Sequence, residues 1–345
     1  MPSSPARVVS FGEIMLRLSP PGFERLLQSP TLSATFGGAE ANVAVSLARW
    51  GFDSIFVTRV PAHGVGDAAI QALRAEGVRT DHVLRGGERL GIYFAESGAS
   101  QRPSTVIYDR AHAAIADIDP AAIDWADIMR GASWFHVSGI TPSLGPKPAR
   151  CVADALAAAR SAKVTTSLDL NFRRKLWSPA DAQAMLRPLL KNVHLVIANE
   201  EDIQSALGLD VPGVDVQTGR VEAAAYRDVT RRVCELGPQL VAITLRESRS
   251  ASDNGWSALL GGASLPDLIE GPRYDIHVVD RIGAGDAFAA GLIYGAATGL
   301  APMESLRFAV AAGALKHSIP GDFNRVSVDE VRRLAAGDAS GRVQR

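Results

Sequence analysis

Short apolar runs alternate with amphipathic segments along most of the chain. The runs are rich in β-branched and aromatic residues and end in polar or glycine-containing turns, as buried strands do. They are VVSF from Val8, IFVTRV from Ile55, WFHVSG from Trp134, VTTSLDL from Val164, LVIAN from Leu195, LVAITL from Leu240 and IHVVD from Ile276. Between them, apolar residues recur at three- and four-residue spacing, which predicts helices over residues 39–50, 66–76, 147–162, 179–191, 200–208, 223–236, 286–299 and 302–317. Alternation of strand and helix predicts an α/β fold, with a mainly parallel sheet between two layers of helices.

Two regions, residues 13–36 and 84–115, interrupt this alternation. In the second region, ERLGIYFAES and STVIYDR read as strands with no helix between them. We expect these regions to form an antiparallel insert, a small β-sheet that covers one end of the parallel core as a lid. The prediction is one domain over residues 1–337 with this lid inserted, followed by a frayed tail over residues 338–345.

Composition and charge exclude several classes of partner. The chain has 345 residues, with 36 Lys and Arg against 37 Asp and Glu, which gives a formal charge of −1. Nucleic acid is excluded because binding it requires a basic face that replaces phosphate counterions. The most apolar stretch, residues 287–301, is shorter than the roughly 20 apolar residues of a membrane span. The N-terminus lacks the apolar core of a secretory signal, so we expect a cytoplasmic protein with no membrane partner.

Ligands of open α/β sheets bind beyond the carboxyl ends of the strands, so the segments after each strand are of interest. The segment RIGAGD, residues 281–286, follows the run that ends at Asp280 and opens a helix. Gly283, Ala284 and Gly285 let the backbone approach a ligand, and the free N–H groups of a new helix bind anions. Asp286 can accept a proton from a hydroxyl held beside that anion. A tight turn with an aspartate that complements the helix dipole explains the same letters.

Two further segments open helices after predicted strands. The glycines of FGGAEAN, residues 36–42, admit a ligand against bare backbone at Gly38, and Asn42 lies one helical turn later. A structural turn with a solvated asparagine is the alternative. In ANEED, residues 198–202, three carboxylates at a helix start can organise hydrated Mg²⁺ near a phosphate. An ordinary helix cap with an acidic first turn is the alternative here, and the residues alone favour it.

Side chains for substrate recognition follow the same strands. Asp169, Asn171 and Arg173 are two residues apart and share one face if their strand continues, and Tyr108 and Arg110 do likewise in the lid. Two guanidinium groups that face one cleft suit a carboxylate, because arginine binds it through two parallel hydrogen bonds. Surface salt bridges are the alternative for each arginine singly.

The sequence argues against other catalytic and cofactor-binding motifs. The segment GVGDAA, residues 64–69, fits the GxGxxA pattern of a dinucleotide-binding fold, but Asp67 would place a carboxylate beside the pyrophosphate. The chain contains no GK followed by Ser or Thr, no HExxH, no GxSxG and no cluster of Cys and His. A nicotinamide-dependent oxidoreductase is kept as an alternative function, and binding of NADH would support it. A P-loop NTPase and a metallohydrolase are disfavoured.

Taken together and in this order, these segments resemble the ribokinase-like (PfkB) family of sugar kinases along most of the chain. GGAEAN is similar to the N-terminal signature of that family and DRIGAGDAFAAG to its C-terminal signature. Within the family, the likeness is greatest to kinases of 2-keto-3-deoxygluconate. It lies in GEIMLRLSP from Gly12, GIYF from Gly91, VIYDR from Val106, DLNFRRKLW from Asp169, TLRESRSASDNGWSA from Thr244 and ALKHSIPGDFN from Ala314.

The resemblance implies a ribokinase-like αβα sandwich with a sheet of eight or nine strands, a β lid, and ATP bound with Mg²⁺ without a P-loop. It implies that Gly283, Ala284 and Gly285 form an anion hole and that Asp286 is the base. It also implies residues for binding the two substrates. The acceptor set is Gly38, Asn42, Tyr93, Tyr108, Arg110 and Arg173, with both arginines near the carboxylate of a sugar acid, and the ATP set is Asn199, Thr244, Arg246, Gly283 and Gly285.

Three departures from the family pattern matter. Asp202 stands where the family's NxxE motif has Glu, so its reach toward Mg²⁺, through water, is shorter by one methylene. TLRES replaces a glycine-containing segment near the ATP, which affects Thr244 and Arg246. Arg281 and Ile282 replace residues near a site that holds a monovalent cation, K⁺, in some relatives. Whether this chain binds K⁺ is left undecided by the sequence.

The expected reaction is transfer of the γ-phosphoryl group of ATP to 2-keto-3-deoxygluconate, which makes the 6-phosphate. Phosphorylation of another acceptor, such as ribose, fructose or a nucleoside, is the nearest alternative. A noncatalytic sugar-binding protein is the alternative of a different class. A lid sheet with an exposed edge also favours pairing into a homodimer or higher homo-oligomer.

Overall fold

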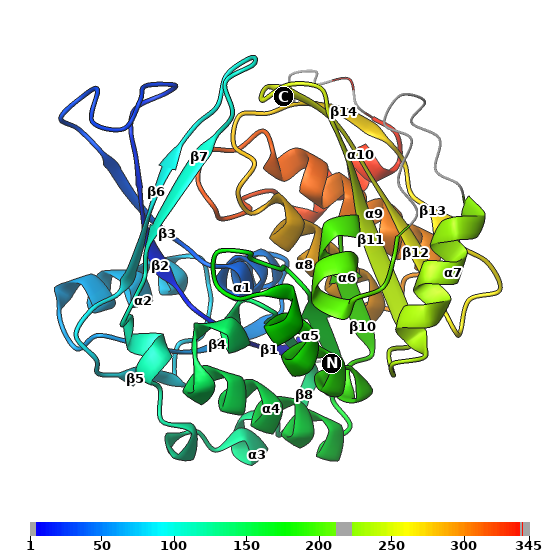
Figure 1. Cartoon of the computed structure of the whole chain (residues 1–345), viewed down its shortest axis with the longest axis horizontal. Coiled ribbons are helices and arrows are strands. Elements are labelled where there is room, and N and C mark those ends of the chain that lie inside the picture. Colours follow the sequence, from blue (N-terminus) through cyan, green and yellow to red (C-terminus); the bar gives the residue numbers. More distant parts are fainter. Residues whose placement is uncertain (1–4, 212–222, 339, 341–345) are drawn as a thin grey trace.

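The central sheet is built from strands that carry apolar residues on both faces. The computed structural model describes residues 5–211, 223–338 and 340, and within these residues ten strands form this sheet (Figure 1). Its order is β13 (Ile269–Glu270), β12 (Asp253–Gly262), β11 (Leu240–Ser248), β10 (Leu195–Ala198), β9 (Thr165–Asp169), β8 (Ala132–Ser138), β1 (Arg7–Phe11), β4 (Asp53–Val60) and β5 (Val83–Arg85), while β14 (Tyr274–His277) pairs with β12. The resemblance implied eight or nine strands, and the difference lies in the short strands at the β12 edge.

The parallel part of the sheet agrees with the prediction, and one edge does not. The strands from β11 through β5 are parallel to their neighbours. By contrast, β12 runs antiparallel to β11, and β14 runs antiparallel to β12. The run from Ile276 that precedes RIGAGD therefore belongs to an antiparallel edge strand, not to the parallel set. Long β12 was missing from the predicted strands because Gly255, Gly261 and Gly262 interrupt its apolar pattern.

Helices cover both faces of the sheet, as the alternation of strand and helix predicted. Neighbouring residues on one strand belong to different cores: Val8 packs into one apolar cluster and Val9 into the other. The first cluster lies against the helices α1 (Ala39–Arg49), α8 (Ala284–Ala297), α9 (Pro302–Lys316) and α10 (Val328–Ala335), with α2 (Gly64–Ala75) beside α1. The second lies against α3 (Trp125–Ile128), α4 (Pro146–Ser161), α5 (Pro179–Leu189), α6 (Glu200–Leu207) and α7 (Ala223–Cys234). Figure 1 shows the resulting three layers.

Helices α5 and α6 begin at local capping signals. The Ser178 hydroxyl accepts a hydrogen bond from the backbone N–H of Asp181, and Pro179 occupies the first helical position of α5. Asn199 caps α6 in the same way, and the helix ends at Gly208 with φ of 65°, a left-handed conformation that suits glycine. These signals explain why the predicted helices over residues 179–191 and 200–208 lie within two residues of α5 and α6.

A second sheet of four strands stands at one end of the core (Figure 1). Its order is β3 (Ser33–Gly37), β2 (Met15–Ser19), β6 (Gly91–Glu96) and β7 (Thr105–Asp109). The two hairpins, β2–β3 and β6–β7, are antiparallel, but β2 pairs with β6 in parallel. The expectation of a wholly antiparallel lid is therefore wrong. Both hairpins leave the core sheet and return to it, and this topology sets β2 and β6 side by side.

Several short elements escaped the sequence pattern. They are α3, α10 and the 3-10 turns Ala114–Asp117, Pro120–Ala122 and Thr141–Leu144. Strand β5 opens the region expected to belong to the lid, yet it pairs with β4 in the core. Most of the tail predicted over residues 338–345 lies outside the described residues. Of the helices described, none has the length and apolar character needed to cross a membrane.

Candidate active site

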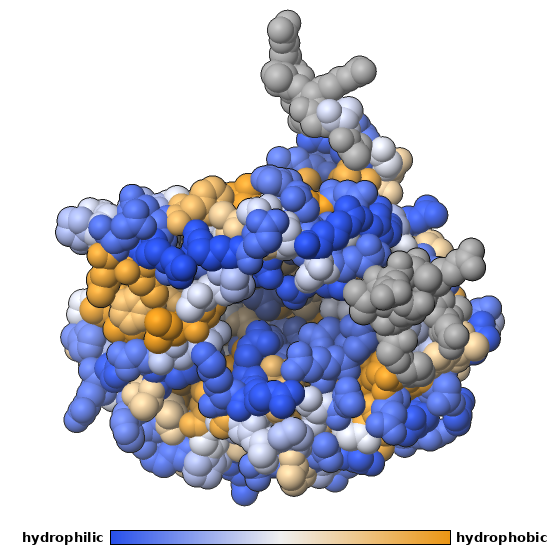
Figure 2. Space-filling model, turned by 45° about the horizontal axis from the view of Figure 1, so that its top comes forward, coloured by the Kyte–Doolittle hydropathy of each residue, from blue (hydrophilic) through white to orange (hydrophobic). Residues whose placement is uncertain are grey.

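A cleft of about 310 Å³ lies beneath the lid, at the carboxyl ends of the parallel strands (Figure 2). Every residue that the sequence suggested for the acceptor, the nucleotide or the chemistry lines this cleft. These residues are Gly38, Asn42, Tyr93, Tyr108, Arg110, Arg173, Asn199, Asp202, Thr244, Arg246, Gly283, Ala284, Gly285 and Asp286. The fold thus brings together side chains from five strands or the segments that follow them, β6, β7, β9, β10 and β11, and from α1, α6 and α8.

The start of α8 presents backbone N–H groups of Gly283, Gly285 and Asp286 at the cleft, and we call this group the α8 mouth. Gly283 precedes the helix with φ of 87°, a conformation that strains other residues, and Ala287 N–H donates back to its carbonyl oxygen at 2.9 Å. Within the part of the chain that the structure describes, the N–H groups of Gly283, Gly285 and Asp286 have no acceptor. A helix N-terminus with free N–H groups carries a partial positive charge, so this mouth suits an anion.

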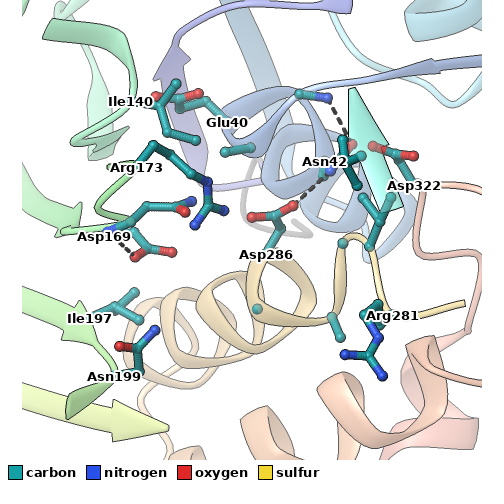
Figure 3. A pocket seen from close by; sticks show the side chains of 18 of the residues that line it. Glu40, Asn42, Ile140, Asp169, Arg173, Ile197, Asn199, Arg281, Asp286 and Asp322 are labelled. Carbon is teal, nitrogen blue, oxygen red and sulfur yellow. Dashed lines mark hydrogen bonds between the residues drawn. The ribbon is translucent and has the colours of Figure 1, made fainter. Parts of the chain in front are cut away.

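Asp286 stands at that mouth with one carboxylate oxygen fixed. The Asn42 side-chain amide donates to Asp286 Oδ2 at 2.6 Å, and Asn42 Oδ1 in turn accepts from Gly38 N–H at 3.3 Å. Figure 3 shows Asp286 pointing from α8 into the cleft, between Asn42 and Arg173. Burial raises the pKa of Asp286 to about 7, against the Asn42 hydrogen bond that lowers it, and the Asp322 and Glu40 carboxylates add to the rise. A carboxylate whose pKa lies close to neutral pH is well suited to act as a general base.

The two arginines expected at the acceptor end have different partners. Arg110 forms an ion pair with Glu13, and both side chains are buried. Burial raises the pKa of Glu13, against the opposing charge of Arg110. Arg173 donates to the Phe172 carbonyl oxygen at 3.3 Å and reaches toward Asp286 (Figure 3). Arg173 is therefore the better placed of the two to receive an anionic substrate, because Glu13 already balances the charge of Arg110.

The predicted alignment of Asp169, Asn171 and Arg173 on a continued strand is wrong. Strand β9 ends at Asp169, and Asn171 has φ of 38°, so the backbone turns there. All three residues still line the cleft. The turn, not strand periodicity, brings Arg173 to its place.

Tyr93 and Tyr108 lie together on the lid strands β6 and β7. Their ring centroids are 6.0 Å apart, and the Arg110 guanidinium lies 5.4 Å from the Tyr108 ring centroid. Tyr93 is 2% exposed, and its hydroxyl donates to Asp322 at 2.6 Å, so this hydroxyl already has a hydrogen-bond partner. Tyr108 is exposed at the mouth of the cleft. Tyr93 thus forms part of the cleft floor, and Tyr108 forms part of its rim.

At the end of the cleft where the sequence predicts the nucleotide, the structure supports the ordinary helix cap for the ANEED segment. Asn199 Oδ1 accepts from Asp202 N–H at 2.8 Å, and Asp202 Oδ1 accepts from Phe172 N–H at 2.9 Å. Burial raises the pKa of Asp202 to about 6. Thr244 and Arg246 reach this end from β11, and the Thr244 hydroxyl donates to the Ala198 carbonyl oxygen at 3.3 Å. The same residues can cap a helix and still face a ligand.

The acidic side chains here fit a hydrated Mg²⁺ rather than a directly coordinated one. Burial raises the pKa of Asp169 well above its usual range, and the Asp202 and Asp286 charges add to that rise. All three residues line the cleft. Yet within residues 5–211, 223–338 and 340, no three Asp, Glu, His or Cys side chains are grouped closely enough to hold a metal ion themselves. Mg²⁺ commonly keeps several waters and binds through one or two carboxylates and substrate phosphates. Asp169 and Asp202 fit that mode.

Several buried charged residues around the cleft escaped the sequence reasoning. Glu40 accepts hydrogen bonds from Ser138 N–H and from the hydroxyls of Ser138 and Thr141, at 2.6 to 2.8 Å, which ties α1 to the end of β8. Arg17 on β2 pairs with Asp280 at 2.7 Å and with Asp322 at 2.9 Å behind the α8 mouth. No periodic pattern distinguishes such residues from surface charges, so the sequence held no signal for them.

The GVGDAA segment lies away from this cleft. It starts α2, with His63 as the cap, and Asp67 pairs with Arg85 at 2.6 Å. A methyl group at Gly66 would lie 2.1 Å from the Pro61 carbonyl oxygen, which gives this glycine a packing role. The structure thus explains the segment as a helix start and gives no support to a dinucleotide site.

Comparison with known proteins gives a consistent set of similarities. The family model described as pfkB family carbohydrate kinase matches residues 5–251 and 262–324. The 2-dehydro-3-deoxygalactonokinase of Haloferax volcanii is 34% identical over 97% of this chain and 98% of its own, and the 2-dehydro-3-deoxygluconokinase of Bacillus subtilis is 29% identical over 93% of each. The solved structure of 2-dehydro-3-deoxygluconokinase from Thermotoga maritima superposes with a TM-score of 0.92 at 48% identity and covers 96% of this chain and all of that one.

Proposed function

Because this chain belongs to the pfkB family of carbohydrate kinases, we propose that it phosphorylates 2-keto-3-deoxygluconate with ATP. The product is 2-keto-3-deoxy-6-phosphogluconate. The observation that carries this proposal is one cleft with Arg173 facing Asp286 and the α8 mouth, which suits an acceptor with a carboxylate at one end and a primary hydroxyl at the other. The relatives from Bacillus subtilis and Thermotoga maritima, both named for this sugar acid under its synonym 2-dehydro-3-deoxygluconate, support it.

Each step in the reaction has a residue suited to it. The acceptor hydroxyl oxygen forms a bond to the γ-phosphorus, the bond from that phosphorus to the bridging oxygen breaks, and ADP leaves. Asp286 orients the hydroxyl and takes its proton late, since its pKa stays far below that of an alcohol. Asn42 fixes one oxygen of Asp286 and so leaves the other for the acceptor.

The transferred group carries its negative charge into the α8 mouth. A largely dissociative transition state needs alignment and charge stabilisation more than covalent chemistry. The N–H groups of Gly283 and Gly285 supply preorganised donors for the phosphoryl oxygens. With ATP, Mg²⁺ held through water by Asp202 and Asp169 would neutralise charge on the β- and γ-phosphates. The lid covers the cleft and keeps water from competing as the acceptor.

The residues at the acceptor end of the cleft determine which sugars bind as phosphoryl acceptors. Arg173 binds the carboxylate, and Arg110, balanced by Glu13, positions the ring of Tyr108 beside it. A neutral sugar would leave Arg173 without its anionic partner, which costs affinity. The galactonate epimer differs at a single hydroxyl and is the acceptor named for the Haloferax volcanii relative, so it belongs in any test.

A coupled assay of ADP release over a small panel of acceptors tests the proposal. The panel contains 2-keto-3-deoxygluconate, its galactonate epimer, gluconate, ribose, fructose and adenosine. The proposal predicts the highest kcat/KM for 2-keto-3-deoxygluconate. A higher kcat/KM for a neutral sugar or a nucleoside would refute the acid as substrate, and preference for the epimer would reassign the acceptor within the same class.

A further inference from the structure

Lys316, the last residue of α9, is fully buried directly behind the α8 mouth. Its relative exposure is 0%, and it is the one charged residue among the largest fully buried side chains of the described residues. Its ammonium group donates to the Ile319 carbonyl oxygen at 3.0 Å. Burying a lysine is costly and favours loss of its proton. A fully buried lysine at this place therefore calls for an explanation beyond packing.

Two carboxylates balance the charge behind the mouth. Arg17 bridges Asp280 and Asp322, at 2.7 and 2.9 Å, and Asp322 also accepts from the Tyr93 hydroxyl. Burial lowers the pKa of Lys316, while the charges of Asp280 and Asp322 oppose that effect. With Arg17 and Lys316 against Asp280 and Asp322, the group holds two positive and two negative charges. By formal charge the cluster is balanced, and its two carboxylates favour the ammonium form of Lys316.

Lys316 also supports the backbone that forms the mouth. A methyl group built on Gly283 would lie 3.2 Å from Lys316 Cε and 2.2 Å from the Asp322 carbonyl oxygen, so Gly283 rests directly on both. Asp280 accepts from Ile282 N–H at 3.1 Å and from Gly321 N–H at 2.9 Å. Lys316 and Asp280 therefore fasten the 319–322 segment beneath the loop that presents the Gly283 amide.

The position of this ammonium group is electrostatically unusual. A cation close to a helix N-terminus is unfavourable for the helix dipole, which favours negative charge there. That cost is offset when an anion occupies the mouth, as the migrating phosphoryl group does in the proposed reaction. Lys316 does not line the cleft, so it acts on that group through the Gly283 backbone and across a short distance.

We propose that Lys316 is a positioning residue for phosphoryl transfer: its buried ammonium group holds the Gly283 amide in place and adds positive potential to the α8 mouth. The inference rests on the proposed role of that mouth. It predicts that loss of the ammonium group slows the transfer step more than it weakens either substrate, because both substrates bind mainly through other residues.

The test compares Lys316→Met with the wild type, using whichever panel acceptor the wild type phosphorylates fastest. We expect kcat to fall by about 10- to 100-fold, somewhat less than the loss of a direct oxyanion donor, with each KM changed by less than about threefold. Lys316→Arg, which keeps the charge, should recover at least part of kcat. Val331→Ala is the control, because Val331 on α10 is fully buried in the apolar cluster that α9 also packs into, and its truncation lowers the melting temperature without changing charge.

The outcomes separate this inference from the proposed function. A wild type that prefers a neutral sugar refutes the acid acceptor but still permits the Lys316 comparison. An unchanged kcat in Lys316→Met, or a loss that Val331→Ala reproduces at equal loss of melting temperature, overturns the role of Lys316. If Lys316→Met does not fold, Lys316→Gln, which keeps a donor for Ile319, takes its place. Failure of both to fold also counts against the inference, because Lys316 is then needed for folding itself.

Discussion

The Asn42 side chain donates a 2.6 Å hydrogen bond to Asp286 across 244 residues of sequence. This bond joins the first turn of α1 to the first turn of α8, so the two glycine-containing segments of the chain meet at one carboxylate. Because Asn42 occupies Oδ2, the other oxygen of Asp286 can face an acceptor hydroxyl. The pairing gives the proposed base a defined orientation before any substrate arrives.

Replacing Asp286 with Asn removes the proposed base and keeps the shape of the side chain. We expect Asp286→Asn to lower kcat by about two to four orders of magnitude, with KM for the acceptor and melting temperature close to wild type. Steady-state kinetics and a thermal melt check this. Asp329→Asn, an exposed aspartate on α10, is the matched control and should behave as wild type. Turnover near the wild-type rate in Asp286→Asn would remove the base assignment.

The pH dependence should follow the ionisation of Asp286. The carboxylate must be ionised to accept a proton, and its pKa is about 7, so kcat/KM for the acceptor should fall as the pH drops below that value. Glu40 and Asp322 raise this pKa, whereas Asn42 and Arg173 lower it. Asn42→Ala should therefore move the acid limb to higher pH. An acid limb that stays in place in Asn42→Ala would mean that another group controls it.

Arg173 should discriminate acids from neutral sugars. We expect Arg173→Ala to raise KM for 2-keto-3-deoxygluconate by about 10- to 100-fold, the value of hydrogen bonds to a charged group, with a smaller effect on neutral sugars. Arg174→Ala is the control, because the neighbouring arginine is exposed and pairs only with Glu201, at 3.4 Å, among the described residues. Equal losses for acids and neutral sugars would assign Arg173 to the phosphoryl group instead of the carboxylate.

Substitution by alanine should lower the stability of the protein at Gly283 and raise it at Gly285. At Gly283, φ is 87° and a methyl group would lie 2.2 Å from the Asp322 carbonyl oxygen, so Gly283→Ala should lose about 1–3 kcal/mol of stability. At Gly285, a methyl group meets no protein atom within 4 Å, so Gly285→Ala should gain up to about 1 kcal/mol from the helix. Denaturant unfolding measures both changes.

The same Gly285→Ala variant should be a poorer kinase. Gly285 lines the cleft, so the added methyl group takes space where the phosphoryl group is proposed to bind, and we expect kcat/KM for ATP to fall about tenfold or more. A variant that is both more stable and fully active would show that the mouth does not hold the phosphates.

Local signals explain what could be predicted from the sequence. Glycine pairs and helix starts are short-range features, so the segments around Gly38 and Gly283 could be recognised. The structure brings the segments that the strand-end rule selected into one cleft. Two of the strand predictions behind this grouping were wrong, because β14 is antiparallel and the strand before Asn171 does not continue. Turns and edge strands depend on tertiary contacts that periodicity does not contain.

Buried charges account for most of what was missed. Glu13, Arg17 and Lys316 look like surface residues in a polar pattern, yet all three are buried. Glu13 and Arg17 pair with residues distant in sequence, and Lys316 lies beneath Gly283. Their burial follows from the way the lid strand β2 and the end of α9 pack around the α8 mouth. Only the three-dimensional arrangement shows that the polar groups behind the cleft form a balanced cluster.

The most direct test of the central claim is a crystal structure with a nonhydrolysable ATP analogue and 2-keto-3-deoxygluconate bound. We predict the terminal phosphate oxygens about 2.7–3.2 Å from the N–H groups of Gly283 and Gly285, with the acceptor's primary hydroxyl within the same range of Asp286. A terminal phosphate that lies away from the α8 mouth, with Asp286 facing neither substrate, would contradict the account.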